Sequence, residues 1–207
     1  MEKMNKKKLR AIKMRKNLIE AAKFLFRKNG YKNTTVDEIV DQALISKATF
    51  YQYFKSKEEL FYRTIEDSGH KLYNLFINIR EKTKNYPLEK RLRTINYYII
   101  TFFERDHYLI YLDVYRDSSY NSKIIEYKKK FAGMFADLME EFFIEIGVDK
   151  KDARSLGFSI KGAAYYQIMQ WFFDGKKENL KLVARHIHRQ FYPFILHQVR
   201  KNKKEMS

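Results

Sequence analysis

Apolar positions along the chain recur with the spacing of α-helices, beginning in the segment "NLIEAAKFLFRKNG". Four apolar residues there stand at i, i+4, i+7 and i+8, which places them on one helical face: Leu18, Ala22, Leu25 and Phe26. Gly30 follows, and glycine readily adopts the left-handed conformation in which many helices end. The pattern predicts an amphipathic helix that ends before Gly30.

Polar residues predict where the next three helices begin. Thr35 precedes Glu38 by three residues, the spacing of a capping box, which predicts a short helix in "TTVDEIVDQA". Ser46 can cap a third helix, "KATFYQYF". Ser56 and Glu59 repeat the capping-box spacing and predict the start of a fourth.

The third predicted helix divides its aromatic residues between two faces. Phe50 and Phe54 are four residues apart and share a face that can pack on the first two helices. Tyr51 and Tyr53 lie outward. Two short helices joined by a tight turn form a helix-turn-helix, whose second helix fits the DNA major groove. The alternative is stacking on single-stranded nucleic acid, but the tyrosine hydroxyls favour contact with duplex phosphates.

The stretch "NLIEAAKFLFRKNGYKNTTVDEIVDQALISKATFYQYFKSKEELF" resembles the DNA-binding domain of TetR/AcrR-type transcriptional regulators. The shared features are "AA…LF…GY" in the first helix, "TTV" at the second and "TFYQYFKSKEEL" over the third and fourth. The resemblance implies a helix-turn-helix domain over residues 1–55, with a basic N-terminal arm. It also implies a helical effector-binding and dimerisation domain over residues 56–207.

The resemblance further implies which residues contact DNA. They are Thr35, Ser46, Lys47, Ala48, Thr49, Tyr51, Gln52, Tyr53 and Lys57. Those that would face bases are Lys47, Ala48, Thr49 and Gln52. Thr35 and Lys57 would contact phosphates, and the hydroxyls of Tyr51 and Tyr53 would reach phosphates or nearby bases. Helix N-termini, such as the one capped by Ser46, also favour phosphate through their free N–H groups.

One position departs from the family's pattern. The turn reads "ALIS" where the family usually has a glycine, as in "AGVS", so Leu44 takes the place of that glycine. A left-handed conformation costs a non-glycine residue roughly 1 kcal/mol or more. We expect either an altered turn or packing of Leu44 that offsets the strain. Ala48 likewise stands where glycine is frequent.

The rest of the chain predicts further helices, which gives an all-α protein of about nine helices. Their ranges are 58–84, 88–105, 106–117, 118–147, 149–173 and 180–201. Pro193 is expected to kink the last one.

The resemblance places the last two long helices in a four-helix bundle between two copies of the chain. Small and bulky residues there suit such an interface: Gly162, Ala163, Tyr166, Met169 and Phe173. Packing within one chain is the alternative. In a dimer, two recognition helices about 34–36 Å apart read successive major grooves, so the operator is expected to be an inverted repeat.

The middle helices are expected to hold an effector pocket. The candidate lining residues are Tyr98, Phe102, Phe103, Tyr108, Tyr111, Leu112, Tyr115, Phe135, Met139, Phe158, Tyr165 and Met169. For each of them, ordinary core packing is the alternative. An aromatic, apolar lining suits a hydrophobic small molecule or an acyl chain.

Composition narrows the class of protein. Basic residues exceed acidic ones by 42 − 25 = 17, which favours a polyanionic partner, although a generally basic surface is the alternative. The chain lacks cysteine, a glycine-rich phosphate loop and metal-ligand spacing among its histidines, so we expect no enzyme activity, metal or cofactor. No stretch suits a membrane span, and a cytoplasmic protein is expected. The segment "MEKMNKKKLRAIKMRKN" is either a flexible basic arm or the solvated start of the first helix.

Together these features predict a ligand-responsive transcriptional regulator, a repressor that binds DNA as a homodimer. Effector binding would favour a state in which the fourth helix moves the two DNA-binding domains out of register. One alternative is a helix-turn-helix protein that binds DNA without an effector. A more remote one is a basic helical protein on a membrane surface.

Overall fold

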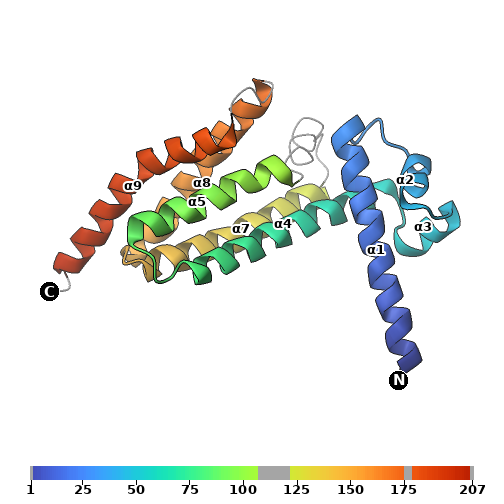
Figure 1. The fold of residues 1–207 in the computed structure, drawn as a ribbon, viewed down its shortest axis with the longest axis horizontal. Coiled ribbons are helices and arrows are strands. Elements are labelled where there is room, and N and C mark those ends of the chain that lie inside the picture. Colours follow the sequence, from blue (N-terminus) through green and yellow to red (C-terminus); the bar gives the residue numbers. More distant parts are fainter. Residues whose placement is uncertain (1, 107–121, 175–178, 206–207) are drawn as a thin grey trace. The chain divides into compact units, whose positions relative to one another are not determined.

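The computed structural model describes residues 2–106, 122–174 and 179–205. Within these ranges the chain forms eight α-helices and no strand, which confirms the all-α class (Figure 1). The helices are α1 (Glu2–Asn29), α2 (Val36–Ala43), α3 (Lys47–Tyr53), α4 (Lys57–Lys82), α5 (Leu88–Arg105), α7 (Ser122–Glu145), α8 (Lys150–Phe173) and α9 (Leu180–Glu205). The helix predicted over residues 106–117 falls almost entirely outside the described residues.

The described residues divide into two compact units. One contains residues 2–69, and the other contains residues 70–106, 122–174 and 179–205. Helix α4 contributes to both, since its first half belongs to the first unit and its second half to the second.

The first unit packs α1 against the short helices α2 and α3 and the start of α4. Its buried apolar residues include Leu18, Ala22, Leu25, Phe26, Ile39, Val40, Phe50, Phe54, Leu60 and Phe61. The rings of Phe26 and Phe61 meet edge to face, with 5.4 Å between their centroids. The fully buried ammonium of Lys23 forms an ion pair with Asp67, which fixes α1 to α4. The apolar face predicted for the first helix is therefore its core face.

Helix α1 is longer than its apolar pattern. It begins at Glu2, so the basic N-terminal segment is the solvated start of the first helix and not a flexible arm. The segment is rich in lysine and also contains arginine and methionine, all of which have high intrinsic helix propensity. The helix ends before Gly30, which has a φ of 80° and whose N–H donates to the carbonyl of Phe26 over 3.0 Å.

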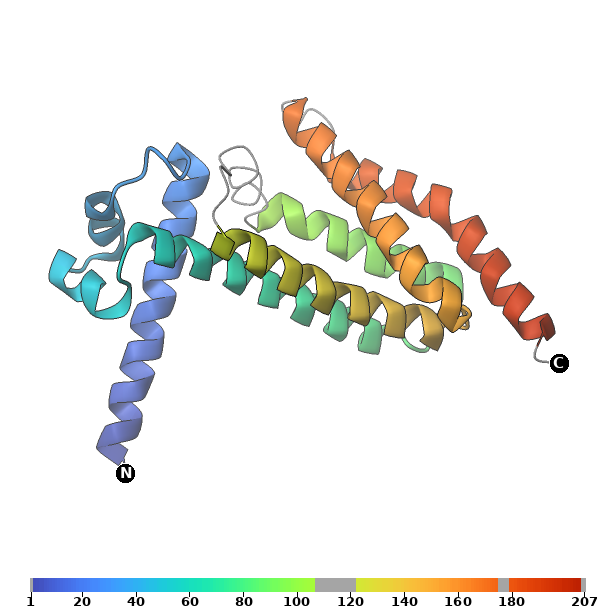
Figure 2. The same cartoon turned by 180° about the vertical axis from the view of Figure 1, so that it is seen from behind.

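The second unit packs α5, α7, α8, α9 and the second half of α4 around one core (Figure 2). The rings of Phe76 and Phe142 cross at 90° with centroids 5.6 Å apart. Helices α7 and α8 approach closely at Gly157, where an added Cβ would lie 3.1 Å from the Cβ of Met139. None of the described helices is both long and apolar enough to span a membrane.

A charged network also closes this unit at the end of α7. Glu145 accepts hydrogen bonds from Arg91 of α5 and from Arg80 of α4. The side chain of Arg91 is almost completely buried, so its charge requires this partner. Burial by itself would raise the pKa of Glu145, but the two arginines outweigh burial and lower it. Glu145 is therefore a carboxylate at neutral pH.

Candidate nucleic-acid interface

The capping box predicted at Thr35 is present in the structure. The hydroxyl of Thr35 accepts from the N–H of Glu38 over 3.2 Å, and the N–H of Thr35 donates to the Glu38 carboxylate over 2.7 Å. The second predicted box, at Ser56, is only half formed. Ser56 accepts from the N–H of Glu59, but the Glu59 carboxylate accepts from the N–H of Lys55 instead of that of Ser56.

The turn between α2 and α3 keeps the backbone that glycine would give. Leu44 has φ 56° and ψ 48°, a left-handed conformation. Its N–H donates to the carbonyl of Asp41 and that of Ile45 donates to the carbonyl of Val40, which together form a Schellman motif. The side chain of Leu44 is 91% exposed. Both expectations for Leu44 were therefore wrong, because the turn is not altered and packing does not offset the strain.

Helix α3 is anchored at its start and by its inner face. Ser46 caps it by accepting from the N–H of Thr49 over 3.1 Å. Phe50 and Phe54 are buried and Tyr51 is about half exposed, as predicted, whereas Tyr53, which was also expected to lie outward, is half buried. The exposed residues of α3 are Lys47, Ala48, Tyr51 and Gln52, and the half-buried ones are Thr49 and Tyr53. The helix thus presents a short polar surface on a fixed support.

Lys47 lies in an ion pair across the turn. Its ammonium is 2.8 Å from a carboxylate oxygen of Asp37, in the first turn of α2, and both side chains are exposed. The hydrogen bond with Asp37 raises the pKa of Lys47, so its positive charge is secure. This contact holds the lysine at the start of α3, where a base or a phosphate could compete for it.

Lys57 is engaged inside the first unit. Its ammonium donates to the carbonyls of Thr34, over 2.7 Å, and of Tyr31, over 2.9 Å, and it lies 4.4 Å from the ring centroid of Tyr31. Burial lowers the pKa of Lys57. An ammonium has three N–H donors, and these contacts occupy at least two of them. Sequence reasoning did not anticipate this role because it depends on a loop about 25 residues away.

The residues expected at the effector pocket differ in burial within the described structure. Phe135 is buried in the core, and Phe102, Phe103 and Met139 pack partly buried against it. Met169 is half buried, whereas Tyr98, Phe158 and Tyr165 are exposed. Tyr108, Tyr111, Leu112 and Tyr115 lie outside the described residues.

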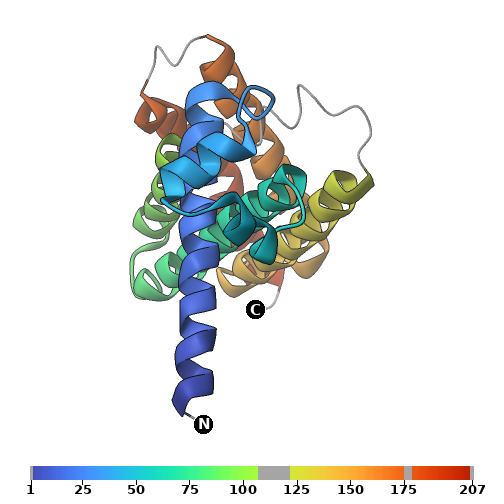
Figure 3. The ribbon, with the colours of Figure 1, turned by 90° about the vertical axis from the view of Figure 1, so that its right-hand side faces the viewer.

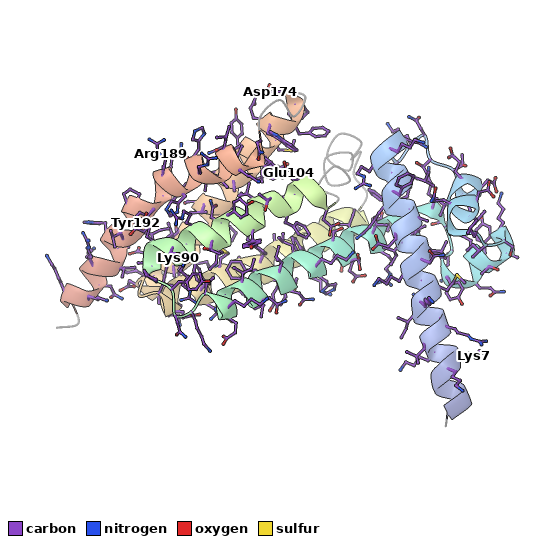
Figure 4. The ribbon with its side chains drawn as sticks, in the orientation of Figure 1. Lys7, Lys90, Glu104, Asp174, Arg189 and Tyr192 are labelled. Carbon is purple, nitrogen blue, oxygen red and sulfur yellow. The ribbon has the colours of Figure 1, made fainter. Side chains whose placement is uncertain are left out.

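A pocket of about 540 Å³ lies between α8 and α9. Its lining residues are Tyr166, Gln167, Gln170, Trp171, Asp174, Val183 and His186, and Asp174 is labelled at the end of α8 in Figure 4. None of the described residues expected at the effector pocket lines it. The only shared position is Tyr166, which was expected at the dimer interface.

The residues expected at the dimer interface are mostly open to solvent in the single chain. Tyr166 is 68% and Phe173 is 59% exposed, and Gly162 is exposed as well. Ala163 and Met169 are half buried. A Cβ added at Gly162 would meet nothing within 4 Å, so packing within this chain does not require a glycine there.

Comparison with known proteins shows which family of proteins this chain is similar to. Residues 18–64 match the family model of bacterial regulatory proteins of the tetR family. The HTH-type transcriptional regulator QacR of Staphylococcus aureus is 31% identical over an alignment of 139 positions that covers 62% of this chain and 70% of QacR. The negative transcriptional regulator IcaR of the biofilm operon icaADBC in Staphylococcus epidermidis is 27% identical over 67% of this chain and 75% of IcaR.

Solved structures share the fold. A TetR-family regulator from Mesorhizobium loti superposes with a TM-score of 0.80 at 16% identity, covering 90% of this chain and 97% of that one. The regulator FadR of Bacillus subtilis, solved in complex with stearoyl-CoA, has a TM-score of 0.64 at 20% identity, covering 84% of this chain and 95% of FadR. At these identities the likeness concerns the fold alone.

Proposed function

Since this chain belongs to the tetR family of bacterial regulatory proteins, we propose that it is a repressor that binds an inverted-repeat operator as a homodimer and leaves it when a hydrophobic small molecule binds. That it is a DNA-binding transcriptional regulator and not an enzyme follows from the family itself. Repression is favoured by the likeness to IcaR, a negative regulator. We place its action in the cytoplasm, where a bacterial chromosome lies.

The observation that carries DNA binding is the outward polar surface of α3. Phe50 and Phe54 fix the helix from within, and the Ser46 cap fixes its start, so the exposed side chains face solvent from a rigid support. Such a helix fits the major groove, where residues near its N-terminus reach base edges.

Each residue of this surface has a proposed role. Those proposed to contact bases are Lys47, Ala48, Thr49 and Gln52. Tyr51 and Tyr53 would place their hydroxyls on phosphates or nearby bases. Thr35 and the N–H groups at the Ser46 cap would meet phosphates. Lys57 would reach a phosphate only by leaving its carbonyl partners in the first unit.

A homodimer through α8 and α9 is supported by the aromatic side chains that these helices expose. Tyr166 and Phe173 stand seven residues apart on one face of α8, and Phe194 of α9 is exposed as well. Large exposed apolar side chains that lie close together are typical of interaction surfaces. The open space at Gly162 would allow a second helix to approach closely.

The effector is proposed to bind in the second unit and to be apolar. The partly buried rings of Phe102 and Phe103 line the core of that unit, and FadR, which shares the fold, was solved with an acyl-CoA. Binding there would shift the population toward a state that does not fit the operator. A regulator that binds DNA without any effector remains the alternative, and its binding would be unaffected by every ligand added.

Selection of bound duplexes from a random library tests the proposal. The full-length protein should enrich an inverted repeat whose half-sites lie about one helical turn apart, or a multiple of that, centre to centre. A library that emerges from selection without any enriched motif would refute sequence-specific binding. The recovered duplex then serves to screen apolar ligands for release of the protein.

A further inference from the structure

The N-terminal segment of α1 is the most strongly charged part of the described chain. Residues 6–16 read "KKKLRAIKMRK", with seven basic residues and no acidic one. All seven basic side chains are exposed. We call residues 6–16 the basic extension. Nothing in the DNA-contacting surface of α3 accounts for this concentration of charge.

Two contacts place the basic extension beside the helix-turn-helix. The side-chain amide of Asn17 donates to the carbonyl of Ala43, the last residue of α2, over 2.9 Å. The guanidinium of Arg15 lies 5.6 Å from the ring centroid of Phe54, just after α3. From this point toward the N-terminus, α1 runs on past α2 and α3 (Figure 3), and Lys7 is labelled on this part in Figure 4. At 1.5 Å per residue, the part that projects is roughly 15–20 Å long.

The protein itself does little to stabilise the extension as a helix. Leu9 and Ile12 are 58% and 56% exposed, and among the side chains of α1 that the structure describes, from residue 6 onward, the first fully buried one is Leu18. Basic residues also stand three or four positions apart, as Lys6 and Lys13 do relative to Arg10, and like charges at this spacing destabilise a helix. A polyanion along the segment would remove this repulsion.

We propose that the basic extension is a second DNA-binding element, which contacts phosphates that flank the bases read by α3. The contact between Asn17 and Ala43 ties it to the turn that precedes α3, so it starts next to the groove that α3 would enter. Its reach of roughly 15–20 Å is enough to follow the backbone beyond the half-site. The claim that the basic extension contacts flanking phosphates rests on the proposed docking of α3 in the major groove. Its affinity for phosphates follows from its own charge and does not depend on that docking.

Duplex DNA fits the extension better than a lipid surface does. A helix that lies on a membrane has a broad apolar face, rich in Trp, Phe and Leu, opposite its basic face. The extension has only Leu9 and Ile12 as large branched apolar residues, and basic residues surround them. Lysine and arginine on all sides are instead typical of sequence-independent binding to phosphates.

Salt dependence tests the proposal directly. In the full-length protein we would replace Lys6, Lys7, Arg10 and Lys13 together with Gln, which keeps a high helix propensity. Loss of four phosphate contacts should flatten the slope of log K against log salt by about 3–4. The ratio of the wild-type affinity for DNA to that of the variant should then fall about tenfold between 0.1 and 0.2 M salt. The matched control replaces Arg200, Lys201, Lys203 and Lys204 of α9 with Gln and should leave the slope unchanged.

Removal of flanking base pairs supplies a second readout. The wild type should lose affinity when the duplex is trimmed to the half-sites, and the fourfold extension variant should not. An extension variant with the wild-type slope would overturn the proposal. The same variant is tested for binding to vesicles of equal phosphatidylglycerol and phosphatidylcholine. If its DNA slope is unchanged but it no longer binds these vesicles, the proposal is overturned and the extension has a membrane role instead.

The test also separates this proposal from the function proposed above. The slopes are measured on the selected duplex and on one of arbitrary sequence. If no sequence is preferred but the extension variant still flattens the slope, specific regulation fails and the extension stands. If the wild type binds neither duplex, both proposals fail.

Discussion

The ammonium nitrogen of Lys57 lies 2.7 Å from the main-chain carbonyl oxygen of Thr34, so the first residue of α4 holds the loop that precedes α2. The same ammonium reaches the carbonyl and the ring of Tyr31. The loop and the start of α4 therefore move as one piece. This matters for regulation, because any movement of α4 would be passed to the helix-turn-helix through these contacts.

Replacing Lys57 with Ala should destabilise the first unit by about 1–3 kcal/mol, because two carbonyls lose a charged donor. Operator affinity should fall for every sequence alike, while the slope of log K against log salt stays that of the wild type. Lys55→Ala, at an exposed neighbouring position, should change neither quantity. Urea unfolding measures the stability, and titration of DNA binding against salt measures the affinity and its slope. A slope flattened by about one contact, with full stability, would instead assign Lys57 to a phosphate.

Leu44→Gly should stabilise the protein by about 0.5–1 kcal/mol. Glycine relieves the left-handed strain at φ 56°, and the exposed leucine side chain contributes no packing that would be lost. Leu44→Ala is the matched control, because alanine keeps the strain and should give no gain. Thermal unfolding of the three proteins measures the difference. Equal gains from glycine and alanine would mean that the leucine side chain, and not the backbone, is the unfavourable feature.

The features that sequence predicted well are those determined by neighbouring residues. The Thr35 capping box, the Ser46 cap and the opposite orientations of Phe50 and Tyr51 follow from spacing within one or two turns. The shifted box at Ser56 shows the limit of such reasoning, since the Glu59 carboxylate could reach either of two N–H groups.

Features that depend on packing between distant segments could not be predicted in this way. Tyr98 and Phe158 were named as candidates for an effector pocket, but the sequence does not show which neighbour covers a side chain, and both are exposed in the single chain. The partners of Lys57 come from a loop far away in sequence, so spacing gave no sign of them. The helical start of α1 was left open because its apolar pattern is weak, and Leu9 and Ile12 are indeed exposed.

Lys47→Ala and Gln52→Ala should each relax sequence discrimination by about 1–3 kcal/mol if their contacts are to bases. The variants should still bind duplex of arbitrary sequence nearly as well as the wild type does. Gln42→Ala changes an exposed polar residue of α2 and should leave discrimination intact. Competition between the selected duplex and single-base variants measures the effect. Unaltered preferences in both variants would remove these residues from the proposed base contacts.

Tyr166→Glu combined with Phe173→Glu should weaken the dimer roughly a hundredfold, because it places two charges in the apolar face of α8. Tyr86→Glu, at another exposed aromatic position, is the matched control and should leave the dimer unchanged. Sedimentation measures the assembly, and circular dichroism checks that the variants remain folded. If the double variant still forms a dimer of wild-type strength, the interface lies elsewhere.

Glu145→Gln should destabilise the second unit by about 1–3 kcal/mol at neutral pH, because Arg91 loses its charged partner in a buried position. The pKa of Glu145 is lowered in the folded protein, so the unfolded chain binds a proton more readily. The stability that the wild type gains from this carboxylate is therefore complete above the ordinary pKa of about 4.5 and lost as pH falls through the folded value. The difference in unfolding free energy between wild type and variant should be constant from pH 7 to about 5 and shrink below that. Urea unfolding at each pH measures this difference, and Glu81→Gln, at an exposed position, is the control. If the difference in unfolding free energy between wild type and Glu145→Gln is the same at pH 3 as at pH 7, the pKa of Glu145 is not responsible for it.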